Sequence, residues 1–255
     1  MRATARLVGV ERNTVMRTLL RIGRQCAALL DRTIRRVPAR RVQVDEIWTY
    51  VFKKQARITD KDPAEGGDQY VFIAMDADTK LVISHVIGKR DAATAFCLIS
   101  DLKDRLAYRV QLTTDGFRPY LNAVEDSFGA DIDYAMLIKV YGAGEHKEGA
   151  PEWYGPPRVI AAMPMPVMGR PQLRHISTSY IERQNLTIRM QARRFTRLTN
   201  AFSKELANLK AQVALHFAHY NFVRIHQTLR CTPAMAAGIT GRLWGLEDLV
   251  AATEP

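Results

Sequence analysis

Hydrophobic side chains in the first 35 residues recur with the period of a helix. In residues 13–30 the apolar positions step by three or four and fall on one face: Val15, Leu19, Ile22, Cys26 and Leu29. A shorter helical stretch precedes this run, and a turn around Gly9 separates the two. The order of short helix, tight turn and long helix predicts a helix-turn-helix segment over residues 1–35.

From residue 42 the pattern changes to that of a mixed fold. Runs rich in β-branched and aromatic residues predict strands at 42–52, 70–88 (two strands joined by a turn), 109–116 and 131–141. Helical spacing predicts helices at 91–105, 118–128, 178–194 and 200–222. The early strands form an antiparallel meander, and the later strands alternate with helices and extend the sheet in parallel. The predicted fold class is therefore α/β, a mixed sheet flanked by helices.

Residues 142–176 break this rhythm. They carry six of the eleven prolines of the chain, and proline interrupts both helices and central strands. We expect an inserted surface loop here, long enough to suggest function or mobility.

The charge balance narrows the kind of partner. Lys and Arg number 37 against 26 Asp and Glu, and the resulting net charge of +11 indicates a polyanion, nucleic acid before a membrane surface. A hydrophobic share of 47% is enough to bury a core, which excludes a wholly disordered chain. No apolar run approaches the roughly 20 residues of a membrane span, and residues 1–20 lack the apolar stretch of a secretion signal.

The three cysteines, Cys26, Cys97 and Cys231, are far apart and odd in number. Without a CxxC pair they predict neither a zinc finger nor a disulfide framework, and they fit a reducing compartment. We therefore expect a cytoplasmic protein, associated with the nucleoid if its partner is DNA.

Three acidic residues stand out against the basic background. Asp45 lies in the middle of an apolar and aromatic strand, Asp115 ends another strand, and Glu182 lies near the start of a basic helix. A charge within a strand core is costly unless something compensates it. Neighbouring central strands would bring the two aspartates together, and a helix across the sheet would bring the glutamate to the same point. Such carboxylates would repel one another unless divalent cations neutralised them, and oxygen-only ligands suit two Mg²⁺ or Mn²⁺ ions.

Each acid also has an ordinary interpretation. Asp45 would pair with an arginine, Asp115 would serve a turn before Gly116, and Glu182 would be a surface charge. Taken singly, the ordinary interpretation is the better one for Asp115 and Glu182, because Asp-Gly turns and helical glutamates are common. Asp45 is the hardest of the three to explain in this way.

Four sequence blocks carry a family resemblance. They are VDEIWTYV (44–51), TTDGFRPYL (113–121), HISTSYIERQNLTIRMQARRFTRLTNAFSK (175–204) and HYNFVRIHQTLRCTPAMAAGI (219–239). Together, in this order and over nearly the whole chain, they resemble transposases of the DDE class of the insertion-sequence-one type. The part ISTSYIERQNLTIR of the third block is specific to this class of transposases.

The resemblance implies a ribonuclease H-like catalytic domain over residues 42–240, with 142–176 as an insertion. It implies that Asp45, Asp115 and Glu182 form the catalytic triad and hold the metal ions. These acids are separated by 70 and 67 positions, and the insertion accounts for the length of the second separation. Residues 36–41 would be a linker and residues 241–255 a C-terminal tail. Family members often carry an N-terminal zinc-binding segment that is absent here, so we expect a truncated or short-start version.

Two groups of residues are candidates for DNA contacts. The start of the second N-terminal helix would enter the major groove with Arg12, Asn13, Thr14 and Arg17. The alternative for this segment is a helical hairpin that packs or dimerises.

The second group follows Glu182 on its helix. Arg189 and Arg193 share the face of the glutamate at helical spacing, and with Arg194 they would bind the phosphate backbone beside the metal ions. The alternative is a solvated face with ion pairs one turn apart. Further along the chain, we expect Asn221, Arg224 and His226 to support the site structurally.

The sequence thus predicts a DNA transposase that cuts phosphodiester bonds at element ends and joins the freed 3′-OH to target DNA. Its partner would be double-stranded DNA, and action on two DNA ends favours a homo-oligomer. Two alternatives stay open: a ribonuclease H-like nuclease without strand transfer, and a truncated or domesticated DNA-binding protein without catalysis. The chain has no GxxxxGK[ST] motif, so no ATP-driven step is indicated.

Overall fold

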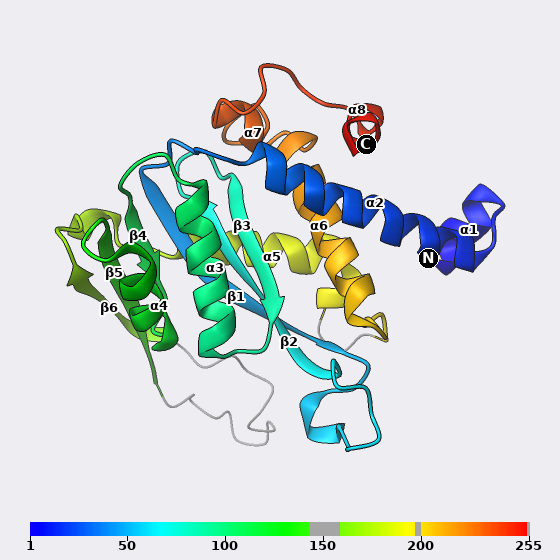
Figure 1. Cartoon of the computed structure of the whole chain (residues 1–255), viewed down its shortest axis with the longest axis horizontal. Coiled ribbons are helices and arrows are strands. Elements are labelled where there is room, and N and C mark those ends of the chain that lie inside the picture. The colour runs from blue at the N-terminus through cyan, green and yellow to red at the C-terminus, as the bar shows by residue number, and fades with distance from the viewer. Residues whose placement is uncertain (143–158, 197–199, 254–255) are drawn as a thin grey trace.

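A six-stranded mixed sheet forms the centre of the protein. The computed structural model describes residues 1–142, 159–196 and 200–253. The strand order is β3-β2-β1-β4-β5-β6 (Figure 1). The strands are β1 (Arg41–Val51), β2 (Gly67–Asp76), β3 (Val82–Gly88), β4 (Gln111–Thr114), β5 (Asp133–Tyr141) and β6 (Val159–Met168).

The strand directions agree with the sequence pattern. β1, β2 and β3 form an antiparallel meander, whereas β4 runs parallel to β1 and β5 runs parallel to β4. The helices α3 (Ala92–Arg105) and α4 (Pro119–Phe128) make the crossovers before β4 and β5 and pack against each other. The prediction of a mixed α/β fold is confirmed, and the topology is consistent with a ribonuclease H-like fold.

The outer strand β6 corrects the expectation of a loop at 142–176. Residues 159–168 pair antiparallel with β5 and form the edge of the sheet, while residues 143–158 lie outside the described part of the chain. Pro164 and Pro166 are two positions apart, so both leave the same side of the strand without an N–H group. An edge strand tolerates proline when that side faces solvent. The prolines therefore mark an edge strand and do not exclude a strand.

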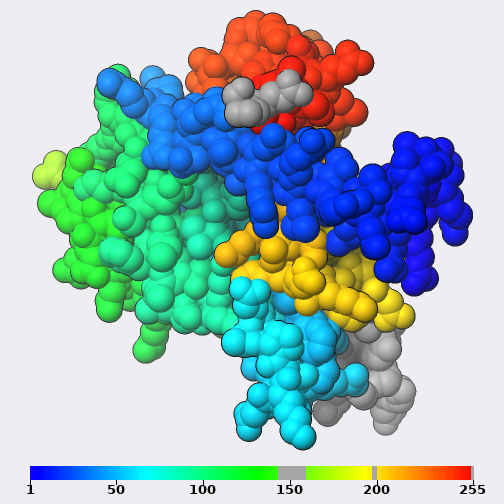
Figure 2. Space-filling view, turned by 45° about the vertical axis from the view of Figure 1, so that its right-hand side comes forward, coloured from blue at the N-terminus to red at the C-terminus, as the bar shows by residue number. Residues whose placement is uncertain are grey.

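The N-terminal residues form α1 (Arg2–Val8) and the long helix α2 (Arg12–Thr33), separated by a turn in which Gly9 has φ 68°. The predicted order of short helix, turn and long helix is present, but its role in DNA binding stays a prediction. Cys26 and Leu29 of α2 are buried, whereas α1 and the start of α2 extend away from the rest of the molecule (Figures 1 and 2).

The C-terminal half of α2 is part of the packed molecule. It lies against α6 (Leu206–Phe222) and α8 (Leu246–Thr253), and Figure 2 shows it between these two parts of the chain. The short helix α7 (Pro233–Ala236) follows α6. None of the helices in the described residues is long and apolar enough to cross a membrane.

Two predicted helices are shorter in the structure. The helix α5 (Ser179–Gln191) ends before the predicted 194, and a single turn of 3-10 helix follows at Arg193–Phe195. The Thr49 hydroxyl of β1 donates to the carbonyl of Arg194, which ties this turn to the sheet. The helix α6 begins at Leu206 and not at 200. Phe202 therefore lies before the helix, where its ring stacks on Tyr50 with the ring centroids 4.9 Å apart.

The α2–α6 contact depends on the absence of a side chain at Gly23. A Cβ atom placed there would lie 2.5 Å from the Cβ of Ala211. Alanine favours helix over glycine by about 1 kcal/mol, but overpacking of this kind costs about 1–3 kcal/mol. We expect Gly23→Ala to lower the melting temperature, measured by circular dichroism. Thr18→Ala at an exposed position of the same helix is the control; a Gly23→Ala protein as stable as this control would contradict the prediction.

Candidate active site

Asp45 and Asp115 meet where the shortest strand of the sheet ends. The parallel register of β1 and β4 pairs Val44 with Thr114, the last residue of β4. Asp45 and Asp115 therefore each follow this pair and lie beside each other. The Asp115 Oδ1 atom accepts a hydrogen bond from the backbone N–H of Phe117 at 3.1 Å, which orients the carboxylate.

Glu182 reaches the same place from α5. The first backbone N–H groups of this helix have no partner within it, and Gln43 of β1 accepts two of them: Oε1 lies 3.0 Å from Tyr180 N and 3.1 Å from Ile181 N. One turn further along, Asn185 Nδ2 donates to Asp45 Oδ2 at 2.9 Å. These contacts hold α5 against β1.

The three predicted acids line one cavity of about 650 Å³. Residues 70 and 67 positions apart in sequence are thus brought to one point by the β1–β4 register and by the docking of α5. Their catalytic role stays a prediction.

Glu46 is an acid that sequence reasoning missed. Among the described residues, Asp45, Glu46 and Asp115 form a cluster in which one carboxylate oxygen of each lies within 4.8 Å of the others. Strand alternation places Glu46 on the opposite face from Asp45, where Tyr120 of α4 donates to its carboxylate at 3.1 Å. The signal available in the sequence is a second acid directly after Asp45, although strand alternation directs neighbouring side chains to opposite faces.

Glu46 and Glu182 differ in their access to the cavity. The Glu46 side chain is 4% exposed and is absent from the described lining of the cavity, whereas the Glu182 side chain is 41% exposed and belongs to that lining. Solvent access thus separates the two glutamates, although Glu46 is the one that clusters tightly with the aspartates.

Two cations partly neutralise the acids. Arg90 lies between two of them: its Nε is 2.6 Å from Glu46 Oε1, and its Nη2 is 3.8 Å from Asp115 Oδ2. The ring of Phe117 covers the Arg90 guanidinium at 4.2 Å. Lys139 of β5 forms an ion pair with Glu182, and the Thr178 hydroxyl donates to the same carboxylate oxygen.

Burial changes the acidity of this cluster. It raises the pKa of Asp45 to about 7, and the nearby charges of Glu46 and Asp115 add to the shift. Burial also raises the pKa of Glu46 and of Asp115 above their ordinary values, against the opposing effect of Arg90. The protein alone therefore does not fully compensate these carboxylates.

The donor set fits a hard divalent cation. All the candidate ligands are carboxylate oxygens, which Mg²⁺ and Mn²⁺ prefer. The cluster is compact, and its raised pKa values indicate that added positive charge would be stabilising.

The predicted DNA contacts near Glu182 differ from the sequence expectation. The prediction that Arg193 continues the helical face of Glu182 is wrong, because α5 ends at Gln191. Arg194 donates to Ser203 Oγ at 2.7 Å and to the Asn208 carbonyl at 2.9 Å, so it stabilises the turn before α6. Arg189 donates to the Phe195 carbonyl at 3.3 Å.

The N-terminal candidates lie on the protruding end of α2. Arg12, Asn13 and Arg17 are exposed there, and Thr14 is half-buried. This end of the helix extends away from the sheet (Figure 1). Their contact with DNA stays a prediction.

The three supporting residues lie outside the described lining of the acidic cavity. Asn221 is fully buried and exchanges two hydrogen bonds with the backbone of Val82, at 3.1 and 2.9 Å, which ties α6 to the outer strand β3. His226 bonds to Thr228 through Nδ1, and its backbone N–H donates to the Cys231 carbonyl. Arg224 is half-buried. A supporting role in the site stays a prediction for all three.

The raised pKa of Asp45 predicts a pH-dependent stability in chelator. The folded chain favours the protonated acid, so stability is lost as the pH rises from about 4, where the unfolded chain titrates, through about 7. We expect Asp45→Asn to stabilise the metal-free protein by at most about 4 kcal/mol at pH 8 and by at most about 1.5 kcal/mol at pH 5. Denaturant unfolding at the two pH values measures this difference. Asp60→Asn, at an exposed position, is the control; equal effects of the two substitutions would contradict the assignment.

Arg90 occupies the place of a counter-ion, which predicts competition with metal. Arg90→Gln leaves Glu46 and Asp115 without their cation, so we expect a lower melting temperature in chelator and a larger rise on addition of Mn²⁺ than in the unmodified protein. Thermal unfolding in EDTA and in excess Mn²⁺ measures both. Arg118→Gln removes an exposed arginine that lines the same cavity and is the control. An Mn²⁺ response of Arg90→Gln no larger than that of Arg118→Gln would contradict the prediction.

Comparison with known proteins gives weak structural likenesses only. No protein-family model and no curated protein sequence matches the chain. Among solved structures, the chain is similar to the Mos1 transposase in a paired-end complex with the left transposon end, at 21% identity and a TM-score of 0.28, over 46% of this chain and 41% of that one. It is also similar to the piggyBac transposase in a synaptic complex with hairpin DNA, at 9% identity and a TM-score of 0.43, over 85% of this chain and 52% of that one. The chain thus covers less than two thirds of either structure. Because both identities lie below 25% and both TM-scores below 0.5, these likenesses by themselves assign neither a family nor a function.

Proposed function

We propose that the protein is a DDE-class DNA transposase of the insertion-sequence-one type. The observation that carries this proposal is the meeting of Asp45, Asp115 and Glu182 in one open cavity. These are the three acids to which the sequence resemblance assigns catalysis. The net charge of +11 supports a DNA substrate.

The acids of the cavity would hold two Mg²⁺ or Mn²⁺ ions, with Glu182 and not Glu46 as the third ligand. Glu46 is enclosed by Arg90 and Tyr120, whereas Glu182 faces the cavity. Such ions would polarise the scissile phosphodiester, lower the pKa of the attacking water and stabilise the leaving oxygen.

The remaining polar groups orient the acids and balance charge. Asn185 directs Asp45, the Phe117 N–H directs Asp115, and the Thr178 hydroxyl directs Glu182. Positioning groups of this kind commonly affect metal affinity and activity about 10–100-fold. Arg90 and Lys139 line the cavity and would attract the DNA phosphate.

The reaction would proceed as two displacements at phosphorus. Water attacks the phosphodiester at the element end and frees a 3′-OH, and this hydroxyl then attacks a phosphodiester of the target DNA. No covalent enzyme–DNA intermediate is needed, so no nucleophilic side chain is required. The predicted contacts of Arg12, Asn13, Thr14 and Arg17 would serve end recognition, and Arg189 and Arg193 would bind phosphate. Action on two ends would use a homo-oligomer.

The test uses duplexes that cover the two ends of the DNA element encoding the chain, one set intact and one pre-cleaved with a free 3′-OH. With Mg²⁺ and a target plasmid, we expect cleavage of the first set and joining of the second. Asp45→Asn and Glu182→Gln should reduce both products below detection while DNA binding is retained, because each removes a metal ligand. Products are resolved on sequencing gels.

Glu46→Gln is the matched control for Glu182→Gln, since the two make the same chemical change. We expect Glu46→Gln to retain measurable joining, as Glu46 does not line the cavity. Activity that survives Asp45→Asn or Glu182→Gln would refute the triad. Cleavage without joining would indicate a nuclease of the same fold, and binding without either product would indicate a non-catalytic DNA-binding protein.

A further inference from the structure

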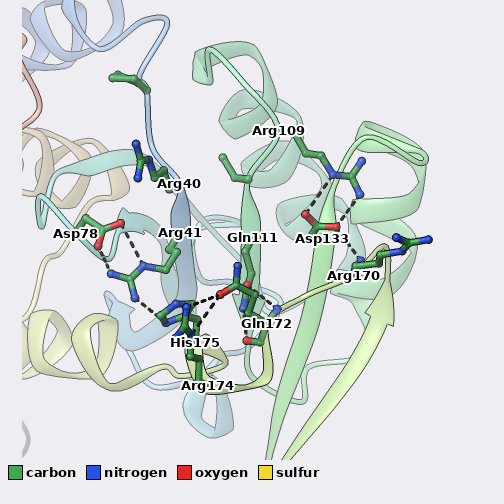
Figure 3. Close-up of a pocket in the computed structure, with 12 residues that line it drawn as sticks. Arg40, Arg41, Asp78, Arg109, Gln111, Asp133, Arg170, Gln172, Arg174 and His175 are labelled. Carbon is green, nitrogen blue, oxygen red and sulfur yellow. Dashed lines mark hydrogen bonds and ion pairs between the residues drawn. The ribbon is translucent and has the colours of Figure 1, made fainter.

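A second cavity, of about 690 Å³, lies at the start of β4 (Figure 3). The acids lie at the opposite end of this strand. Gln111, the first residue of β4, lines this second cavity, whereas Asp115, which follows β4, lines the acidic cavity. Its wall carries five arginines: Arg40, Arg41, Arg109, Arg170 and Arg174. The only carboxylates in the described lining belong to Asp78 and Asp133.

The two carboxylates are already used by two of the arginines. Arg41 forms an ion pair with Asp78, and Arg109 lies 2.8 Å from Asp133 (Figure 3). Within the described chain, Arg40, Arg170 and Arg174 have no carboxylate within ion-pair distance. The Arg174 guanidinium bonds to the neutral amide oxygen of Gln172 at 3.2 Å. Three exposed arginines of the cavity lining therefore have no ion-pair partner among the described residues.

Hydrogen bonds hold the wall of this cavity in place. Gln172 and Gln111 exchange bonds at 2.9 and 3.2 Å, and the Arg170 N–H donates to Asp133 Oδ1 at 2.8 Å (Figure 3). Arg41 Nη1 lies 2.9 Å from His175 Nδ1. The segment 170–175 is thus bonded to the starts of β1, β4 and β5. The backbone that carries Arg170 and Arg174 is therefore held in place before any ligand arrives, which reduces the entropic cost of binding.

The basic and acidic cavities lie on one face of the sheet. Arg41, Gln43 and Asp45 alternate along β1 and share a face. Gln43, between them, accepts the first N–H groups of α5. Four residues of strand correspond to about 13 Å, which is about four base pairs along a duplex axis. The start of α5 covers the strand between the cavities, where Gln43 is 3% exposed. A single DNA duplex that contacts both cavities would therefore pass over this end of the helix.

We propose that this basic cavity binds the sugar-phosphate backbone of duplex DNA, a few base pairs from the phosphodiester held at the acids. The choice of DNA as ligand rests on the proposed function. The exposed side chains end in guanidinium groups, and one guanidinium group donates two parallel hydrogen bonds to the oxygens of a phosphate. The cavity lining contains no aromatic side chain apart from His175 among the described residues, so it offers little for base stacking. The contact would add affinity without reading sequence.

The test measures binding of a random-sequence 30-base-pair duplex, in EDTA and at 50 and 200 mM salt, by fluorescence anisotropy. The variant is Arg40→Gln/Arg170→Gln/Arg174→Gln. Each phosphate contact contributes about 0.9 to the slope of log affinity against log salt. Loss of three contacts should make the slope shallower by about 2.7, so the ratio of unmodified to variant affinity should fall about 40-fold between the two salts. The loss should be the same for unrelated duplex sequences.

The control is Lys61→Gln/Lys204→Gln/Lys210→Gln, which removes the same charge at exposed positions outside both cavities. A control that reduces the slope as much as the variant, or a variant that binds DNA as the unmodified protein does, would overturn the proposal. So would a variant that loses binding to polyglutamate but not to DNA, since it would identify an acidic-protein site. An unaltered Mn²⁺-induced rise in melting temperature shows that the variant is folded with an intact acidic cavity.

The result of this binding test is distinguishable from the result of the cleavage and joining test of the proposed function. Binding is measured in EDTA, without cleavage, so a protein that binds through the basic cavity but never joins DNA would support this inference and refute the transposase. An active transposase with unchanged binding in the triple variant would do the reverse. If the unmodified protein binds no duplex at all, the inference is wrong.

Discussion

The candidate active site depends on one constraint: the fold encloses carboxylates of like charge next to each other at the end of β4. Because β4 stops at Thr114 while β1 continues, Asp45 has no strand partner on that side and lies beside Asp115. Burial there raises the pKa of both carboxyl groups, and Arg90 and Lys139 offset only part of the cost. The fold thus maintains an electrostatically unfavourable arrangement, which is common where a protein provides a place for a cation or a reacting group.

Opposite charges are separated along this one face of the sheet. The segment that begins at Gln172 forms the wall of the basic cavity, and its continuation into α5 brings Thr178 and Glu182 to the acidic cavity. Between the two, Gln43 fixes the start of α5 through two backbone N–H groups. One short stretch of chain, residues 170–182, therefore positions groups of both cavities. Its second part, from residue 176, belongs to the specific block that carries the sequence resemblance.

Much of the fold could be predicted because local pattern and local structure agree. The apolar step in α2 and the run of β-branched and aromatic residues in β1 correspond to buried positions such as Cys26, Leu29 and Val44. Prediction failed where a tertiary partner changes the local preference. Pro164 and Pro166 suggest a loop, but they occupy the edge strand β6, the position in a sheet where proline is tolerated. The Arg194 guanidinium bonds to the turn before α6, a contact that the sequence did not predict, and its contact with DNA stays a prediction.

The sequence by itself determined the kinds of element, their order, the basic charge and three acids as the candidates for catalysis, because these follow from periodicity, composition and motif. Only the tertiary structure decided that Glu46 joins the aspartates but is closed off from the cavity, and that five distant arginines surround a second cavity. Those facts depend on strand register and on side-chain packing between segments far apart in the chain. Such contacts are set by the burial of the whole core, and no local pattern encodes them.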